Sequence, residues 1–278
     1  MQPGRAMPPL FPISQLWRYP VKGLSGQPLV SADLSAGKHF PGDRKYAIGA
    51  GNEKVGDGLW LKKAFFLQLM SHEALAGIDC DFDMDENREM IILSRDDKQL
   101  LSANMQSDSG RRAVAAFFDG LLNGQWRGPA RMVCLDDGAF TDTHAPLISL
   151  GGSASLTSFG DLTGTKPDSR RFRLNIIFET TTPFEEAALI GKRLTAGDVQ
   201  LDVIDPVGRC AAIDVDPETA ERGPHYLPIM EKAFGHTDLG IFARVTQGGT
   251  ISLGDELSVL PRSLERNMHN PSCTGQSG

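Results

Sequence analysis

The sequence lacks any long apolar stretch. No part of its 278 residues approaches the run of about 18 uninterrupted apolar side chains that a membrane-spanning helix needs. The segment Met1–Met7 carries one arginine but has no apolar core behind it, so it does not show the pattern of a secretory signal. We therefore expect a cytoplasmic protein without a membrane span.

Cysteine and histidine are scarce and are not spaced like metal ligands. The four cysteines stand far apart, and neither a Cys-x-x-Cys pair nor a His-x-x-x-His spacing occurs. Zinc knuckles, iron–sulfur clusters and histidine-ligated metals are therefore not indicated. Cys80 and Cys134 lie in ordinary domain sequence and are expected to be structural thiols, and Cys273 lies in a polar C-terminal segment and is expected to have no role.

An excess of positive charge is also missing. The 28 Lys and Arg residues are outnumbered by 35 Asp and Glu residues, which gives a net charge of −7. This balance argues against nucleic acid as a partner, but it leaves room for a local basic pocket that binds one anionic ligand. The Gly-x-Ser-x-Gly signature of serine hydrolases and the phosphate-binding P-loop are absent as well.

Short apolar runs that alternate with Gly and Pro turn signals are what the sequence does contain. This pattern predicts a mainly β fold with peripheral helices (α+β), built from β-barrels rather than a doubly wound sheet. We expect a disordered N-terminus over residues 1–12, a small β-rich domain over 13–126, a β-barrel domain over 127–260 and a flexible tail over 261–278.

Individual elements follow from the same patterns. Gly110–Leu122 is expected to be a helix, because its apolar residues fall at helical spacing and Asn123-Gly124 supplies a stop signal. Short helices are also expected at Ser153–Phe159, Phe184–Leu189 and Leu227–Phe234. The expected strands are Ile13–Arg18, Gln27–Asp33, Tyr46–Ala50, Met90–Leu93, Arg131–Leu135, Asn175–Glu179, Val199–Asp205, Cys210–Val215, Gly240–Val245 and Glu256–Leu260.

Cys210 is distinguished from the other cysteines by its neighbours. A lone cysteine in a strand is most often a small, half-buried core residue. Here Arg209 precedes it, and a fixed positive charge favours the thiolate form, while Gly208 allows the backbone to approach a bulky ligand. Two interpretations remain open at this point: an inert core thiol, and a thiolate that acts as nucleophile or soft-metal ligand.

Several further residues have the character of an anion site. Ser153, Ala154 and Ser155 follow a Gly-Gly pair at the start of an expected helix, where backbone N–H groups are free to bind an anion. Cations beside tight turns or before a strand have two interpretations: they are solvent-exposed surface charges, or they bind a phosphate group. These cations are Lys22, Arg44, Arg170, Arg171 and Arg173.

Six motifs, in order along roughly residues 13–260, resemble the two-domain MOSC family. Its members have an N-terminal β-barrel domain followed by a molybdenum-cofactor sulfurase C-terminal domain, and the best known are the mitochondrial amidoxime-reducing component and its bacterial relatives. The motifs are Tyr19-Pro20-Val21-Lys22, Gly42-Asp43-Arg44, Ser153-Ala154-Ser155-Leu156, Arg171-Phe172-Arg173-Leu174-Asn175, Arg209-Cys210 with Val215-Asp216-Pro217, and Gly249-Thr250-Ile251-Ser252-Leu253-Gly254-Asp255.

The resemblance implies a molybdenum cofactor, molybdopterin carrying molybdenum, with Cys210 as the protein ligand of the metal. It carries no expectation of pyridoxal phosphate. Molybdopterin has a phosphate and a sulfur-bound metal, so cations, helix N–H donors and one soft thiolate suit it. The cofactor-binding residues that the resemblance implies are Lys22, Arg44, Ser153, Ala154, Ser155, Arg173, Asn175, Arg209 and Cys210.

The implied activity is that of a molybdenum-dependent oxidoreductase. It would remove an oxygen atom from small N-hydroxylated or N-oxide substrates in a two-electron reduction, with Cys210 and Asp216 as catalytic residues and Asp214 and His225 as further candidates for proton handling. The chain has no ferredoxin-type cysteine spacing, so a separate donor protein of flavin, ferredoxin or cytochrome type is expected to supply electrons.

Three positions, Gly23, Leu174 and Gly208, depart from the family pattern, and we expect the substrate side of the pocket to differ there. Two alternatives remain open from the sequence. One is a non-redox cofactor-binding or sulfur-carrier module with a persulfide on Cys210. The other is a cysteine-dependent hydrolase or lyase that pairs Cys210 with His225.

Overall fold

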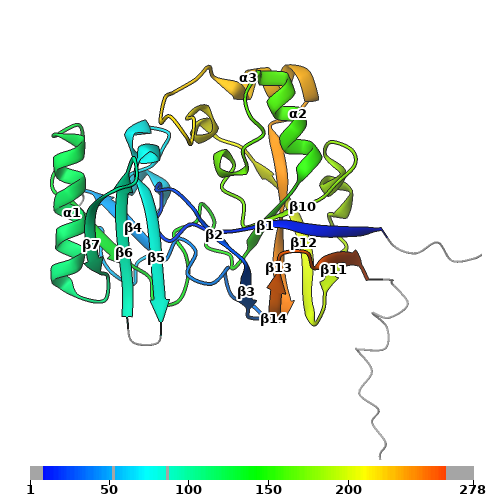
Figure 1. The fold of residues 1–278 in the computed structure, drawn as a ribbon, viewed down its shortest axis with the longest axis horizontal. Coiled ribbons are helices and arrows are strands. Elements are labelled where there is room, and N and C mark those ends of the chain that lie inside the picture. The colour runs from blue at the N-terminus through cyan, green and yellow to red at the C-terminus, as the bar shows by residue number, and fades with distance from the viewer. Residues whose placement is uncertain (1–8, 52–53, 86–87, 261–278) are drawn as a thin grey trace, which may run out of the picture.

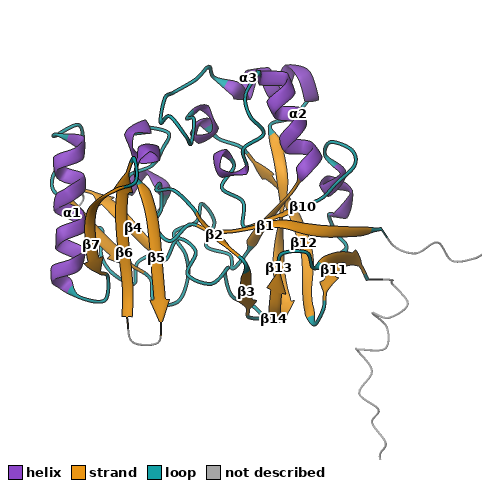
Figure 2. Ribbon diagram, viewed as in Figure 1, coloured by secondary structure: helices purple, strands orange, loops and turns teal. Residues whose placement is uncertain are grey.

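A computed structural model describes residues 9–51, 54–85 and 88–260 (Figure 1). Within them the chain is mostly β with three α-helices (Figure 2), as the sequence predicts. The expected flexible tail, with Cys273, and the first eight residues lie outside the described residues. The first strand begins at Leu10, and Phe11 packs into the core. The prediction of disorder up to residue 12 is therefore wrong for residues 10–12.

Seven strands close into a β-barrel, and the predicted fold class is thereby confirmed. Successive hydrogen-bonded neighbours join the seven strands, and the first and last of them also pair with each other, which closes the ring. Around the barrel the order is β10 (Ile176–Phe178), β9 (Ile148–Gly152), β13 (Asp238–Gln247), β12 (Val199–Gly208), β11 (Arg193–Ala196), β15 (Glu256–Val259) and β1 (Leu10–Arg18).

Alternating apolar residues fill the barrel. In β12, Val199, Leu201 and Val203 are buried at every second position, as expected for a strand with one face toward the core. The N-terminal segment takes part in this assembly: β1 closes the ring, β2 (Gln27–Leu29) pairs with β1, and β3 (Ser31–Leu34) pairs with β14 (Gly249–Ser252). The start of the chain is thus hydrogen-bonded to the second half, across the boundary expected near residue 126.

The rest of the first half forms a separate layered unit, seen at the left of Figure 1. It contains a two-stranded sheet, β4 (Tyr46–Ala50) with β8 (Ala130–Cys134), and a three-stranded sheet of β5 (Asp79–Asp85), β6 (Arg88–Arg95) and β7 (Lys98–Asn104). In the part of the chain that is described, no ladder joins these two sheets, so this half is not a single closed barrel. Two 3₁₀ turns, η1 (Lys63–Phe65) and η2 (Glu73–Gly77), lie between β4 and β5.

The helix α1 (Asp108–Leu122) packs against β7 and β8. The stop signal acts as predicted, whereas the helix begins at Asp108, two residues before the predicted start. Ser107 accepts a hydrogen bond from the N–H of Gly110, and Asn123 adopts the left-handed conformation at the C-terminal end.

In the second half, α2 (Ser153–Thr163) connects the parallel neighbours β9 and β10, and α3 (Tyr226–Phe234) packs against α2. Shorter 3₁₀ turns are η3 (Ser169–Arg171) and η4 (Glu185–Leu189), the latter at a predicted helix. No helix among residues 9–51, 54–85 and 88–260 is long and apolar enough to cross a membrane.

The strand expected at Cys210–Val215 is wrong. Residues Ala211–Asp214 form a 3₁₀ turn, η5, with Cys210 in extended conformation immediately before it. The backbone N–H groups of Ile213 and Val215 donate back to the carbonyl oxygens of Cys210 and Ala212, so they are not available to a sheet. The ladder between β12 and β13 has already ended at Gly208, opposite Asp238.

Candidate functional site

A pocket of about 350 Å³ lies between the layered N-terminal unit and the barrel. This volume falls within the range of about 300–1,000 Å³ that is usual for small-molecule sites. Loops from both halves line it, including the segment after β1, the turn before β4, the segment between η3 and β10, and the end of β12. Six of the predicted site residues meet there: Lys22, Arg44, Arg173, Asn175, Arg209 and Cys210.

The pocket is strongly positive although the chain is acidic. Its lining contains six cations, Lys22, Arg44, Lys63, Arg171, Arg173 and Arg209, and one carboxylate. That carboxylate, Asp142, lies 3.0 Å from the Nζ of Lys22 and 3.3 Å from that of Lys63. Arg44 pairs with Asp43 and Arg171 with Asp216. Within the described residues, Arg173 and Arg209 have no carboxylate partner.

Arg173 is held in a stack of charged and aromatic groups. Its guanidinium lies 4.4 Å from the ring centre of the buried Tyr19, and the guanidinium of Arg44 lies 4.8 Å from the same ring. One nitrogen, Nη1, donates to the carbonyl oxygen of Leu24, whereas Nη2 is buried without an acceptor. Burial, with a smaller effect from Arg44, lowers the pKa of Arg173 to about 10, so it stays charged at neutral pH.

Arg209 shows the same pattern. Nη1 donates to the carbonyl oxygen of Phe172 at 2.7 Å and Nε to that of Val207 at 3.3 Å, but Nη2 is buried without an acceptor. Burial lowers the pKa of Arg209 to about 10. A buried charged donor without a partner is costly. Two such donors in one positive pocket are suited to an anionic group.

The backbone at two of these cations is unusual. Arg44 and Arg173 adopt positive φ values of 45° and 55°, a region that residues other than glycine rarely occupy. Such residues cost about 1–3 kcal/mol each and are concentrated at functional sites. Both are held by neighbouring backbone: the N–H of Arg44 donates to Tyr19 at 2.6 Å and that of Arg173 to Ser169 at 3.2 Å.

Cys210 is half-buried in the pocket wall, and within the described part of the chain its sulfur forms no disulfide. The other two described cysteines do not line this pocket. Burial raises the pKa of Cys80 to about 12 and that of Cys134 to about 11, so both are protonated at neutral pH. No group of three or more His, Cys, Asp or Glu side chains that could hold a metal ion occurs in the described residues.

Asn175 also lines the pocket, but its side chain makes hydrogen bonds to neighbouring strands. Its Oδ1 accepts from the backbone N–H of Ser149 at 3.1 Å and from the Ser149 hydroxyl at 2.9 Å, and its Nδ2 donates to the carbonyl oxygen of Trp17 at 3.3 Å. These contacts tie β9, β10 and β1 together beneath the pocket.

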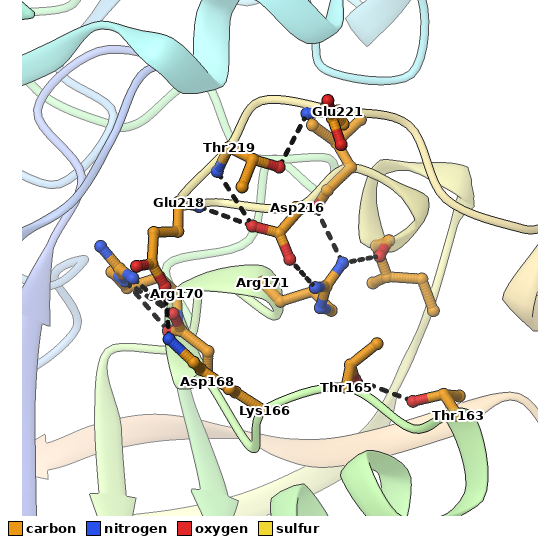
Figure 3. Close-up of polar contacts among 12 residues, drawn as sticks. Thr163, Thr165, Lys166, Asp168, Arg170, Arg171, Asp216, Glu218, Thr219 and Glu221 are labelled. Carbon is orange, nitrogen blue, oxygen red and sulfur yellow. Dashed lines mark hydrogen bonds and ion pairs between the residues drawn. The ribbon is translucent and has the colours of Figure 1, made fainter.

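Asp216 does not line the pocket, contrary to its predicted catalytic role. Its Oδ2 accepts from Arg171 at 2.7 Å, and its Oδ1 accepts from the backbone N–H groups of Glu218 and Thr219 at 2.9 and 3.0 Å (Figure 3). Burial acts to raise the pKa of Asp216, but these hydrogen bonds and Arg171 outweigh it and hold the pKa below its usual value. The carboxylate therefore has no proton to donate near neutral pH, and it orients Arg171 instead.

His225 and Asp214 form a pair outside the pocket. His225 Nδ1 lies 2.9 Å from Oδ2 of the buried Asp214, whose other oxygen accepts the N–H of Tyr226 at the start of α3. Neither residue lines the pocket that contains Cys210. The cysteine–histidine pair of a hydrolase or lyase is therefore not formed in the structure.

The predicted residues at the start of α2 also lie outside the pocket lining. Ser153 donates to Glu179 at 2.9 Å, Ser155 donates to Glu186 at 2.8 Å, and the N–H of Ala154 donates to the Thr180 hydroxyl at 3.0 Å. Two glutamates thus stand where the sequence suggested an anion, and they stabilise the positive end of the helix. Ser153, Ala154 and Ser155 thus form the first turn of α2, after the N-cap residue Gly152, and in the structure these groups bind the segment that follows β10.

The three positions that depart from the family pattern, Gly23, Leu174 and Gly208, all line the pocket. Gly23 has a φ of +88°, and a Cβ there would lie 3.2 Å from the carbonyl oxygen of Leu67, so the turn requires glycine. Sequence reasoning missed Lys63 and Asp142 in the lining, because single charged residues in loops carry no local signal of a site.

Comparisons with known proteins match parts of this chain. The MOSC domain family matches residues 148–258. Molybdenum cofactor sulfurase of Drosophila pseudoobscura pseudoobscura is 42% identical over 62 residues, which is 22% of this chain and 8% of that protein. The sulfurase of Drosophila ananassae is 35% identical over 94 residues, 32% of this chain and 12% of that protein. The matches thus span only about a tenth of these curated relatives.

Two solved structures are similar to this chain, one over most of its length and one over less than half. YuaD from Bacillus subtilis has 12% identity and a TM-score of 0.43, covering 90% of this chain and 96% of that one. YiiM from Geobacillus stearothermophilus has 22% identity and a TM-score of 0.34, covering 41% of this chain and 54% of that one.

Proposed function

We propose that this chain, which contains a MOSC domain, binds a molybdenum cofactor in the 350 Å³ pocket, with the Cys210 thiolate as the protein ligand of the metal. The observation that carries the proposal is the pair of buried donors, Nη2 of Arg173 and Nη2 of Arg209, that have no acceptor in a pocket with surplus positive charge. An anionic pterin cofactor supplies such acceptors, and charge-assisted hydrogen bonds are the strong ones.

The ligand set supports a cofactor rather than a free metal ion. Cys210 stands without a cluster of other ligating side chains in the described residues, and one thiolate does not hold a bare ion. A metal bound here therefore brings most of its ligands with it, as a metal on a dithiolene-bearing pterin does. The soft sulfur of Cys210 completes that coordination.

The reaction that we propose is the two-electron reduction of small N-hydroxylated or N-oxide compounds. For a hydroxylamine the balance is R–NH–OH plus two electrons and two protons, giving R–NH₂ and water. When bound, the cofactor supplies the electrons and the position that accepts the oxygen atom, and a separate electron-donor protein restores the electrons. The chain has to hold the cofactor, orient the substrate and deliver protons.

Lys22 is the residue that we assign to proton supply, in place of Asp216. Its ammonium lines the pocket and donates to the carbonyl oxygen of Phe140 at 2.8 Å and to Asp142 at 3.0 Å. Burial lowers the pKa of Lys22, although Asp142 opposes the shift. A lysine with a lowered pKa gives up its proton more readily than a solvated one.

A second candidate function is sulfur transfer. The curated relatives are named molybdenum cofactor sulfurases, and the half-buried thiol of Cys210 in a pocket is open to carry a persulfide. An intact mass one sulfur atom heavier than the sequence mass, lost in Cys210→Ala, would identify this state.

A direct assay distinguishes the two functions. The full chain, made in a host with an intact cofactor pathway, is supplied with a chemically reduced viologen dye and benzamidoxime. We expect dye oxidation with one benzamidine formed for every two dye molecules oxidised. Molybdenum-loaded protein that reduces no amidoxime, hydroxamate or hydroxylamine, and that carries a persulfide, would establish sulfur transfer instead.

A further inference from the structure

A second cavity, of about 330 Å³, lies beside the first. The two share a wall, because five residues line both of them. These residues are Gly23, Leu69, Arg171, Arg173 and Ala212. Small-molecule sites are often found between structural units, and this cavity lies between the β5–β7 sheet and the barrel loops that follow Cys210.

One wall of the second cavity is acidic. Asp79 and Asp81 alternate with the buried Cys80 along β5, so both point away from the sheet core, and Ser94 is paired with Asp79 across the ladder. Asp97 follows in the turn between β6 and β7 and also lines the cavity. Within the described residues, none of these three aspartates forms an ion pair or a side-chain hydrogen bond.

Two of the three cations that line the second cavity are paired with carboxylates. Arg170 is bound by Asp168 through Nε and Nη2, and Arg171 is bound by Asp216 (Figure 3). Only Arg173, on the shared wall, lacks a carboxylate partner in the described part of the chain. When the paired carboxylates are counted, the second cavity therefore carries a net negative charge, whereas the first carries a net positive charge.

The shared wall also presents a hydrogen-bond donor. The side chain of Arg171 is 2% exposed and lines both cavities. Its Nη1 donates to the carbonyl oxygens of Ile213 and Val215 and its Nη2 to Asp216, but its Nε is buried without an acceptor. Arg171 at the shared wall thus keeps one donor without an acceptor, and the aspartates offer a place for a positive charge.

The remaining lining suits the body of an organic molecule. Apolar side chains from β1, β2, the segments that follow β1 and η1, and the loop after Cys210 also line the cavity. The apolar residues are Trp17, Leu24, Pro28, Leu69, Ala212, Val215 and Pro217.

We propose that the second cavity is the substrate pocket and that it selects organic cations. The preferred substrates are N-hydroxylated or N-oxide compounds that carry a separate ammonium or amidinium group, with the N–O end at the shared wall and the cation beside Asp79 and Asp81. The assignment as a substrate pocket rests on the proposed function, whereas the binding of cations does not.

The test uses benzamidine as a cationic probe and benzamide as its uncharged analogue, each titrated into the full chain by calorimetry at low ionic strength. In the double variant Asp79→Asn/Asp81→Asn we expect the Kd for benzamidine to rise about tenfold, since each exposed ion pair contributes about twofold to fivefold. The Kd for benzamide should not change. Equal benzamidine affinity in wild type and double variant would overturn the proposal, as would benzamide binding to wild type as tightly as benzamidine.

The control variant is Asp83→Asn. Asp83 is an exposed aspartate on the same strand, two residues beyond Asp81, but it pairs with Arg88 and does not line the cavity. This variant should bind benzamidine like wild type, and a loss equal to that of the double variant would mean that general surface charge, not the cavity, attracts the probe.

The two proposals fail separately. Binding of benzamidine through Asp79 and Asp81 in a chain that never takes up molybdenum supports the cation pocket and contradicts the proposed function. A molybdenum-loaded reductase whose KM for cationic substrates is unchanged in Asp79→Asn/Asp81→Asn overturns the substrate pocket and leaves the proposed function intact.

Discussion

Cys210→Ala is expected to yield a folded protein without molybdenum. The Cys210 sulfur is the one covalent connection that we propose between chain and metal, and no cluster of other His, Cys, Asp or Glu side chains in the described residues can replace it. Because the thiol is half-buried, its removal should cost about 1 kcal/mol or less of folding free energy. The measurement is molybdenum per chain in wild type and variant, both made in a host with an intact cofactor pathway, together with their unfolding temperatures.

Cys80→Ala is the matched control for this experiment. Cys80 is buried in the core of the N-terminal unit, away from the first pocket, so its loss should lower stability but leave the molybdenum content unchanged. Equal molybdenum in wild type and Cys210→Ala would show that the thiolate is not the ligand.

Arg173→Ala is expected to weaken retention of the cofactor by about 10-fold to 100-fold, since a hydrogen bond to a charged group contributes about 1.5–3 kcal/mol. The variant loses both the donor without an acceptor and the stack on Tyr19. Molybdenum and pterin that remain on the chain after gel filtration, compared with wild type at equal starting load, give the result.

Ser155→Ala provides the comparison for Arg173→Ala. Its hydroxyl donates to the buried Glu186 and accepts the N–H of Phe184, so its loss should cost about 1–3 kcal/mol of stability. The cofactor should remain bound. The opposite outcome, with full retention in Arg173→Ala and loss in Ser155→Ala, would place the cofactor at the start of α2 and contradict the site described here.

Much of the barrel follows from alternation of apolar and polar residues. The predicted strand Tyr46–Ala50 has the bounds of β4, and β12 is found where Val199–Asp205 predicts it. Strand β5 was missed because its outward positions are aspartates, which have low strand propensity, although Cys80 and Phe82 alternate with them in the core. The apolar run after Cys210 was mistaken for a strand, because a short run does not distinguish a strand from a helical turn.

The site was predictable to the extent that its residues lie in motifs. Lys22, Arg44, Arg173, Arg209 and Cys210 come from four segments and line one pocket. A turn of small residues before a helix does indicate backbone N–H donors that need acceptors. The sequence around α2 does not show which groups in the fold accept from them. The glutamates at positions 179 and 186 are brought there by the chain that follows β10.

Anomalous diffraction at the molybdenum edge, from crystals of the full chain loaded in a host with an intact cofactor pathway, tests the central claim most directly. The account predicts one strong peak per chain within bonding distance of the Cys210 sulfur, with the cofactor phosphate at Nη2 of Arg173 or of Arg209. A well-occupied molybdenum away from that sulfur, or loaded crystals with no peak in the pocket, would contradict it.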